Sequence, residues 1–170
     1  MSNEPEIHVG ETKIKGVSFS KTLGVVIDEH LTWEKQIENI QTKISKGIGT
    51  LRKMRKLVPK TTLTKVYNAI ILPHFDYCSL VWDNCSDYLI DELQKLQNRA
   101  TCVITGKTYE TRSRDVLKEL HWQPLKERFK RKKSIFTHKI RNDKMPSTTT
   151  NMFDIKTQGA TSVAKPRFQP

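Results

Sequence analysis

The sequence is poor in cysteine, and its cysteines do not have the spacing of a structural site. Cys78, Cys85 and Cys102 are odd in number and form no CxxC pair. This excludes a disulfide-rich secreted domain and favours a reducing compartment, nuclear or cytoplasmic. The first ten residues are polar and acidic, and no apolar run approaches the length of a membrane span. We therefore expect an intracellular protein that is neither secreted nor bound to a membrane.

Acidic residues are also scarce, 18 against 30 lysines and arginines, and no two aspartates are adjacent. Two-metal phosphoryl chemistry needs carboxylates close together, and Asp76 has no acidic neighbour in the chain. His74 and Cys78 are four residues apart and Cys85 follows, but no fourth zinc ligand and no residue to orient a Cys–His pair is evident. The sequence therefore predicts no metal site, no cofactor and no catalytic residue, and it favours packing roles for His74 and Cys78.

What the chain does have is a net charge of +12 concentrated in two segments. Residues 33–56 hold seven basic and two acidic side chains, residues 124–141 hold eight and one, and the rest of the chain is balanced. A surface that only maintains solubility would normally mix both signs, so we favour nucleic-acid binding through phosphate contacts over a merely solvated face. The predicted contacts are Lys43, Lys46, Arg52, Lys53, Arg55, Lys56, Lys130, Arg131 and Lys133.

The first basic segment has the pattern of one long helix. Its apolar residues recur at alternating steps of three and four, which is the spacing of a buried helix face: Ile37, Ile40, Ile44, Ile48 and Leu51. Thr32 is the expected N-cap, and Pro59 ends the segment. Gly47 and Gly49 lie inside this pattern and are expected to let another backbone, from protein or nucleic acid, approach closely.

Further helices are predicted after Pro59. Thr61 or Thr62 can cap the first, and Pro73 is expected to kink it. Ser86 or Asp87 can cap a further helix that Gly106 ends, Ser113 can cap a short one, and Pro124 is the expected first residue of the last. The last helix is expected to have one stripe formed by Leu125, Phe129, Lys132, Phe136 and Ile140. Tyr67 and the three tryptophans, Trp33, Trp82 and Trp122, are expected to pack in the core or at helix ends rather than to stack on bases.

The N-terminal part predicts short strands. Leu23, Val25 and Ile27 occupy every second position and would share one apolar face, which predicts one strand from Lys21 to Asp28. Its partner strand is expected at Lys13–Phe19. The fold class is therefore mainly α with a small N-terminal antiparallel β-ribbon (α+β). We expect a ribbon at residues 1–30, a helical domain at 31–145 and a disordered tail at 146–170.

Several motifs together resemble one known family. The runs KTLGVVIDEHLTW, KISKGIGTLRKMR, LTKVYNAIILPHFDYCSLVW and LQKLQNRA occur in the order seen after the catalytic palm in reverse transcriptases of non-LTR retrotransposons, the jockey-like and related LINE elements. The resemblance extends from about Val9 to about Pro146. It implies that residues 1–30 resemble the hairpin that closes the palm and grips the primer, with Leu23, Gly24 and Val25 opposite Lys13–Val17.

The same resemblance implies that residues 31–145 form a thumb-like helical bundle, which packs along the duplex of template RNA and nascent DNA. Lys43, Lys46, Lys53 and Arg55 are the implied backbone contacts. The implied partners are the RNA/DNA duplex or template RNA, and the palm and fingers of the same polyprotein.

The sequence departs from this family in one respect that matters for activity. The family places its metal-binding aspartates in an earlier palm motif and in a Tyr-x-Asp-Asp motif, and this sequence has no Asp-Asp pair. We therefore expect a C-terminal part of an RNA-directed DNA polymerase that is not catalytic alone, whereas the intact enzyme would use Mg²⁺. Two alternatives stay open: a helical domain retained for protein interaction, and a decayed coding fragment.

Overall fold

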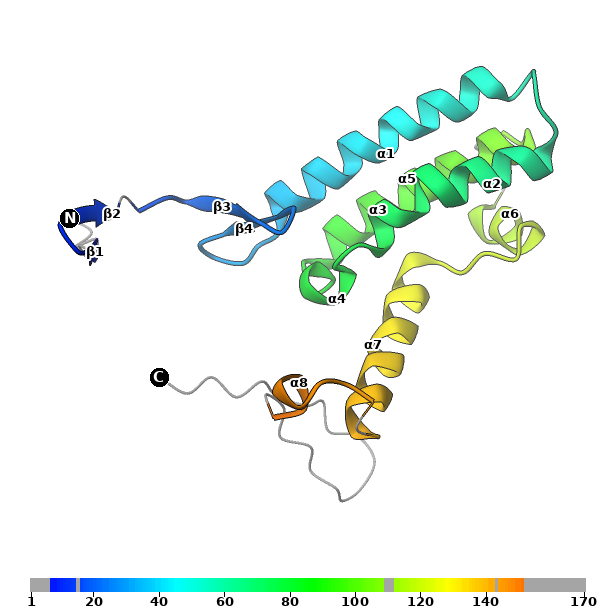
Figure 1. Ribbon diagram of the computed structural model, residues 1–170. Helices are drawn as coiled ribbons and strands as arrows, with labels where there is room; N and C mark the ends of the chain where they lie inside the picture. The colour runs from blue at the N-terminus through cyan, green and yellow to red at the C-terminus, as the bar shows by residue number, and fades with distance from the viewer. Residues whose placement is uncertain (1–6, 15, 109–111, 143, 152–170) are drawn as a thin grey trace. The chain divides into compact units, whose positions relative to one another are not determined.

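A computed structural model describes residues 7–14, 16–108, 112–142 and 144–151 (Figure 1). The chain divides into two compact units, residues 1–122 and 123–170, and each is described by itself. The first unit contains β1 (Ile7–Val9), β2 (Thr12–Ile14), β3 (Phe19–Thr22), β4 (Val25–Asp28), α1 (Glu34–Met54), α2 (Lys60–Ile70), α3 (Leu72–Asp76), α4 (Ser79–Trp82), α5 (Asp87–Thr105) and α6 (Ser113–Glu119). The second contains α7 (Leu125–Arg141) and α8 (Ser147–Asn151). The predicted class, mainly α with small N-terminal antiparallel strands, is confirmed.

The strands form two separate antiparallel hairpins, β1–β2 and β3–β4. In the second hairpin Phe19 pairs with Asp28 and Thr22 with Val25, so the chain reverses at Leu23 and Gly24. Both turn residues have positive φ, 49° and 81°, as a type I′ turn requires. The prediction of one strand from Lys21 to Asp28 with Leu23 on its apolar face is wrong, since Leu23 is 85% exposed in the turn.

The predicted pairing is wrong for the same reason. The strand opposite β4 is β3, residues 19–22, and not the segment from Lys13. A two-residue turn can bring together only the residues that flank it directly, so once Gly24 is in the turn the register is fixed.

The connection from β4 into α1 is organised by Asp28. Its carboxylate accepts hydrogen bonds from the backbone N–H groups of His30, Thr32 and Trp33, at 3.2, 2.9 and 2.8 Å. These bonds, led by that from Thr32, lower the pKa of Asp28. The N-cap position is occupied by Trp33, with φ 67°, and not by Thr32 as expected. The hydroxyl of Thr32 still accepts a hydrogen bond from the N–H of Glu34, the first residue of the helix, at 3.4 Å. The three N–H groups just before α1 are thus satisfied by a strand residue.

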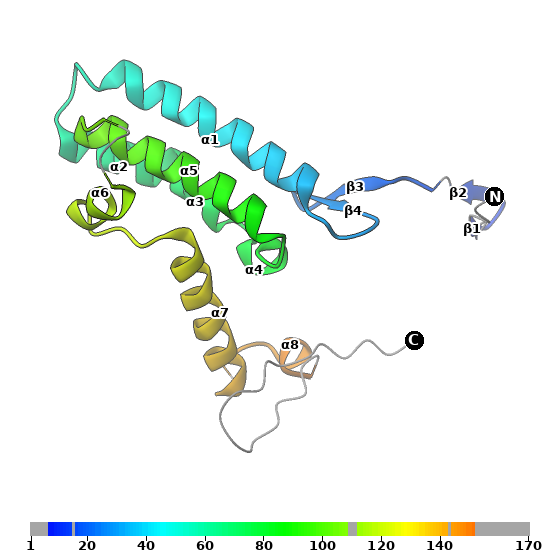
Figure 2. The same ribbon diagram turned by 180° about the vertical axis from the view of Figure 1, so that it is seen from behind.

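Helix α1 lies alongside α5 in both views of the molecule, with α2 and α3 completing the bundle (Figures 1 and 2). The predicted apolar face of α1 is confirmed, because the five residues that define it are all less than 5% exposed: Ile37, Ile40, Ile44, Ile48 and Leu51. Helix α1 contacts α2 and α5, which contribute the buried residues Leu63, Tyr67 and Leu93 to the core. The regular recurrence of apolar residues along α1 therefore positions the bundle.

The two glycines of α1 differ in their surroundings. A Cβ added at Gly47 would lie 2.6 Å from Cγ1 of Ile71, whereas one added at Gly49 would meet nothing within 4 Å. Gly47 therefore permits close packing of α1 against the end of α2, but the group that approaches it is the side chain of Ile71 and not another backbone, as had been expected. Gly49 has no such role among the residues that the structure describes.

Two of the expected helix boundaries hold and two do not. The break at Pro73 is confirmed, because α2 ends at Ile70 and α3 begins at Leu72. Gly106 ends α5 with φ 81°, as expected. The cap expected at Thr61 or Thr62 is wrong because Pro59 occupies the N-cap position, and α6 begins with Ser113 itself rather than being capped by it.

The aromatic residues expected in the core are packed inside the first unit. Trp33 and Trp82 are 4% and 0% exposed, and Tyr67 is 1% exposed. Trp122 is half-buried and stacks on Tyr67, with ring centroids 4.0 Å apart. This stack fixes the segment after α6 against α2.

In the second unit, α7 begins after Pro124, which occupies its N-cap position. Leu125, Phe129 and Ile140 are buried and Phe136 is half-buried, which agrees with the predicted stripe. Helix α8 lies at the start of the segment expected to be disordered. The rest of that segment, 152–170, lies outside the described residues.

A three-residue ion cluster joins distant parts of the first unit. The carboxylate of Glu119 pairs with the ammonium groups of Lys60 and Lys107, the latter at 2.5 Å. Hydrogen bonds from these two lysines, Lys107 first, lower the pKa of Glu119 from 4.5 to about 2. The cluster therefore links the first turn of α2, the segment after α5 and the end of α6.

Because the folded-state pKa of Glu119 is depressed, its contribution to stability is complete above its unfolded value and is lost as the pH falls through the folded one. We expect Glu119→Gln to lower the melting temperature above pH 4.5, and the difference from wild type to shrink towards zero as the pH approaches about 2. Thermal melts of both proteins across this range measure the difference. Glu38→Gln, which removes a carboxylate with a single lysine partner on its own helix, is the control and should show a smaller difference. A pH-independent gap for Glu119→Gln would contradict the assignment.

Candidate nucleic-acid interface

The six basic residues predicted on or just after α1 are all exposed: Lys43, Lys46, Arg52, Lys53, Arg55 and Lys56. Lys46 and Lys53 are seven residues apart, so their side chains leave the helix in nearly the same direction. That direction is opposite to Ile44 and Leu51, which face the bundle. Lys46 and Lys53 therefore form an outward basic row on the solvent side of α1.

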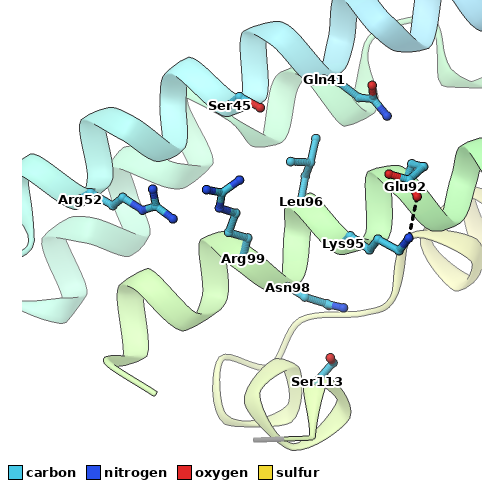
Figure 3. Close-up of a pocket in the computed structure, with 9 residues that line it drawn as sticks. All are labelled: Gln41, Ser45, Arg52, Glu92, Lys95, Leu96, Asn98, Arg99 and Ser113. Carbon is cyan, nitrogen blue, oxygen red and sulfur yellow. Dashed lines mark hydrogen bonds and ion pairs between the residues drawn. The ribbon is translucent and has the colours of Figure 1, made fainter. Parts of the chain in front are cut away.

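The other basic residues of this segment point to the flanks. Lys43 lies on the side of α3, where its charge adds to burial in lowering the pKa of His74. Arg55 follows the last residue of α1, and its guanidinium lies near Gly106, where an added Cβ would be 3.0 Å from Nη2. Arg52 lies on the other flank, towards α5 (Figure 3). Composition alone suggested one basic face. The structure instead has an outward row, with Lys43 on the α3 side of it and Arg52 on the α5 side.

A groove of about 730 Å³ separates α1 from α5 (Figure 3). The residues that line it come from three helices, and all but Leu96 have polar or charged side chains: Gln41, Ser45 and Arg52 of α1, Glu92, Lys95, Leu96, Asn98 and Arg99 of α5, and Ser113 of α6. The guanidinium groups of Arg52 and Arg99 point toward one another across it (Figure 3). Lys95 donates to Glu92 at 2.6 Å, and this bond raises the pKa of Lys95. The groove therefore has a cationic end formed by two arginines.

Sequence reasoning found Arg52 but missed Lys95 and Arg99. Helix α5 carries three acidic and two basic residues, so its composition draws no attention to a basic site. The available signal was spacing, because residues 92, 95, 96 and 99 recur at three and four and therefore share one side of the helix.

Helix α7 presents the second basic segment. Lys130, Arg131 and Lys133 are exposed, and Lys132 is half-buried beside the apolar stripe. Consecutive residues of a helix diverge by about 100°, so Lys130 and Arg131 cover different sectors of the surface. The basic residues of α7 therefore surround the exposed part of the helix rather than forming one narrow row.

The three residues carried over as a primer grip lie at the β3–β4 turn. The hydroxyl of Tyr77 donates to the backbone carbonyl of Leu23 at 2.6 Å, and the Tyr77 ring lies beside Gly24. Val25 is buried, and the N–H of Val26 donates to Oε1 of Gln36 at 2.9 Å. The turn is thus held from both sides, by the segment between α3 and α4 and by α1.

Two further observations concern metals and membranes. Within residues 7–14, 16–108, 112–142 and 144–151, no three side chains of His, Cys, Asp or Glu come together as a metal site would need. In the same part of the chain no helix has the length and apolarity to cross a membrane. The expectations of no metal and no membrane partner stay predictions.

The chain is similar in sequence to a Drosophila melanogaster protein named probable RNA-directed DNA polymerase from transposon X-element. The two are 28% identical over 120 residues, which cover 68% of this chain and 13% of that protein. No family model matches the chain, and no solved structure matches it. The similarity supports an origin in a retrotransposon reverse transcriptase, of which the chain spans a small part.

Proposed function

We propose that this chain is the part of a non-LTR, jockey-like reverse transcriptase that follows the catalytic residues, comprising the end of the palm and the thumb. In this proposal it binds the backbone of the template–primer RNA/DNA duplex. The observation that carries the proposal is the outward basic row of α1, Lys46 and Lys53, which lies opposite the buried face. Similarity to a transposon RNA-directed DNA polymerase supports the nucleic-acid partner.

The chemistry of this row suits phosphate rather than bases. Lysine ammonium groups on a helix surface neutralise phosphates and release counterions, which makes binding strongly salt-dependent and nearly independent of sequence. The exposed basic residues of α7, Lys130, Arg131 and Lys133, supply the same chemistry in the second unit. A helix face of this kind meets the outside of a duplex, as a thumb would.

Catalysis is assigned elsewhere in the polymerase. The chain has no Asp-Asp pair, so we place the metal-binding carboxylates and their Mg²⁺ outside it. Val17, Phe19 and Leu23 around the second hairpin are 64%, 56% and 85% exposed, an apolar surface that suits contact with the palm of the same polyprotein.

Binding of a labelled RNA/DNA hybrid tests the proposal. We expect Lys46→Gln with Lys53→Gln to weaken binding about tenfold and to reduce the salt slope by roughly one for each lost contact, because two phosphate contacts disappear. The measurement is fluorescence anisotropy between low and high salt. The matched control is Lys65→Gln with Lys118→Gln, which removes the same charge from exposed positions on α2 and α6.

The second basic helix is tested by itself with Lys130→Gln, Arg131→Gln and Lys133→Gln together. If wild-type binding does not change with salt, or if the control pair weakens it as much as the α1 pair, the proposed interface is wrong. A stoichiometric protein partner without nucleic-acid affinity would favour the alternative of a retained interaction domain.

A further inference from the structure

We infer that Leu57, in the turn between α1 and α2, is an apolar contact that makes this protein prefer an RNA/DNA hybrid to a DNA duplex. This inference rests on the proposed function for its ligand, and it adds a residue that distinguishes one form of duplex from another. The outward row of lysines cannot make this distinction by itself, because phosphates are present on every duplex.

Leu57 is held in the open by an ordered turn. Its side chain is 81% exposed, more than any other large apolar side chain of the described residues except Leu23. The N–H groups of Leu57 and Val58 both donate to the carbonyl of Met54, at 2.8 and 3.1 Å, and Pro59 then occupies the N-cap position of α2. Residues 54–58 therefore make one further turn beyond α1, and this turn directs Leu57 into solvent.

The position of Leu57 continues the outward basic row. Lys46, Thr50, Lys53 and Leu57 are separated by steps of four, three and four, so they follow one side of α1 and of the turn that extends it. All four are exposed. A rise of 1.5 Å per residue places Leu57 about 6 Å along the helix axis beyond Lys53 and about 16 Å beyond Lys46. A duplex that contacts both lysines therefore reaches Leu57 as well.

The surroundings of Leu57 are basic, which favours a polyanion as its ligand. Residues 39–75 hold eight lysines and arginines and no acidic residue. Arg55 and Lys56, directly before Leu57, are both exposed. Glu119, which approaches the first turn of α2, is already paired with two lysines. An apolar side chain in such a basic surface suits a ligand that presents apolar sugar faces between its phosphates.

The shape of the minor groove decides which duplex can accept this side chain. A-form helices, including RNA/DNA hybrids, have a wide and shallow minor groove. The minor groove of B-form DNA is only about 6 Å wide, which is narrower than the diameter of about 10 Å of a helix with its side chains. Leu57 extends directly from α1, so the end of that helix would collide with the walls of the narrow groove. The wide groove admits the leucine against the sugars.

The test measures binding of an RNA/DNA hybrid and of a DNA duplex of the same sequence and length by fluorescence anisotropy. We expect Leu57→Ser to weaken hybrid binding about fivefold, as the loss of one partly buried leucine would, and to change binding of the DNA duplex by less than about twofold. The salt slope should stay as in the wild type, because no ionic contact is lost. Leu57→Met keeps an apolar side chain and should restore most of the affinity.

The matched control is Leu31→Ser, which truncates another exposed leucine, near the opposite end of α1, and should leave both affinities unchanged. Since Leu57 is not part of the core, thermal melts of Leu57→Ser and the wild type should coincide. No loss on the hybrid, equal losses on the two duplexes, or an equal loss in Leu31→Ser would overturn the inference. The same dependence on Leu57 in binding to vesicles of phosphatidylserine and phosphatidylcholine would also overturn it.

The lysine variants separate this inference from the proposed function. Lys46→Gln with Lys53→Gln should weaken binding to both duplexes and lower the salt slope on each. If the lysine pair has this effect and Leu57→Ser has none, the inference alone is wrong. If neither substitution weakens binding, the proposed duplex interface is wrong as well.

Discussion

Trp82→Ala is expected to lower the free energy of unfolding by about 3–5 kcal/mol, the largest effect of any single substitution considered for this chain. The Trp82 side chain is 0% exposed, and its indole Nε1 donates to the backbone carbonyl of Tyr77 at 2.9 Å. Truncation removes a large, fully buried side chain, leaves a cavity in the core, and removes the donor to that carbonyl. Urea unfolding followed by circular dichroism measures the loss.

The control for this prediction is Trp82→Phe. Phenylalanine keeps most of the apolar volume but cannot donate to the carbonyl of Tyr77, so its cost should be the smaller one of a lost, part-buried hydrogen bond, about 0.5–1.5 kcal/mol. Alanine must therefore cost clearly more than phenylalanine. If the two variants are equally stable, the side chain of Trp82 does not fill the core in the way described.

Gly47→Ala is expected to be less stable than Gly49→Ala by about 1–3 kcal/mol, although the two substitutions are chemically identical and lie two residues apart. Both should gain about 1 kcal/mol from the better helix propensity of alanine. At position 47 the new methyl would lie 2.6 Å from Cγ1 of Ile71, which is 0% exposed, whereas position 49 offers open space. The difference between the variants therefore isolates the close contact of α1 with the end of α2.

Chemical denaturation of the two single variants and the wild type checks this expectation. Gly49→Ala should be at least as stable as wild type, because nothing opposes its gain in propensity. Equal stabilisation at both positions would show that α1 and α2 can move apart at no cost in free energy. The close contact at Gly47 would then contribute nothing to the stability of the fold.

The sequence specified the buried face of α1 well, but not the way the helix begins. Twenty-one residues with a sustained apolar period leave little choice of which side is buried, so Ile37 and Leu51 could be assigned at once. The start of the helix depends on Asp28, whose side chain satisfies N–H groups up to five residues away. Several residues near α1 could cap it, and composition alone does not distinguish among them.

The second hairpin shows how a regular pattern can mislead. Alternation continues from Lys21 to Asp28, so periodicity alone predicts one strand across the turn. The dipeptide Leu23–Gly24 places glycine where positive φ is required, but it also places leucine at φ 49°, a conformation that residues other than glycine rarely adopt. The hydrogen bond from Tyr77, 54 residues away, helps to hold this turn and could not be seen in the local sequence.

The candidate interface was only partly predictable, because charge along a helix does not reveal its neighbours. The outward positions of Lys46 and Lys53 follow from their spacing relative to the apolar face. The groove requires Arg99 to face Arg52, and this depends on how α5 packs against α1, which is a tertiary property. Locating a basic segment is therefore easier than dividing it into separate surfaces.

The two long edges of the β3–β4 hairpin are not equivalent. On the β4 side, the N–H of Val26 is occupied by the side chain of Gln36, so this edge is closed by its own helix. On the β3 side, residues 19–22 are exposed along their whole length. An isolated two-stranded ribbon is marginal in water and gains stability from a third strand. Any sheet that grows from this ribbon must therefore grow in one direction only, outward from β3.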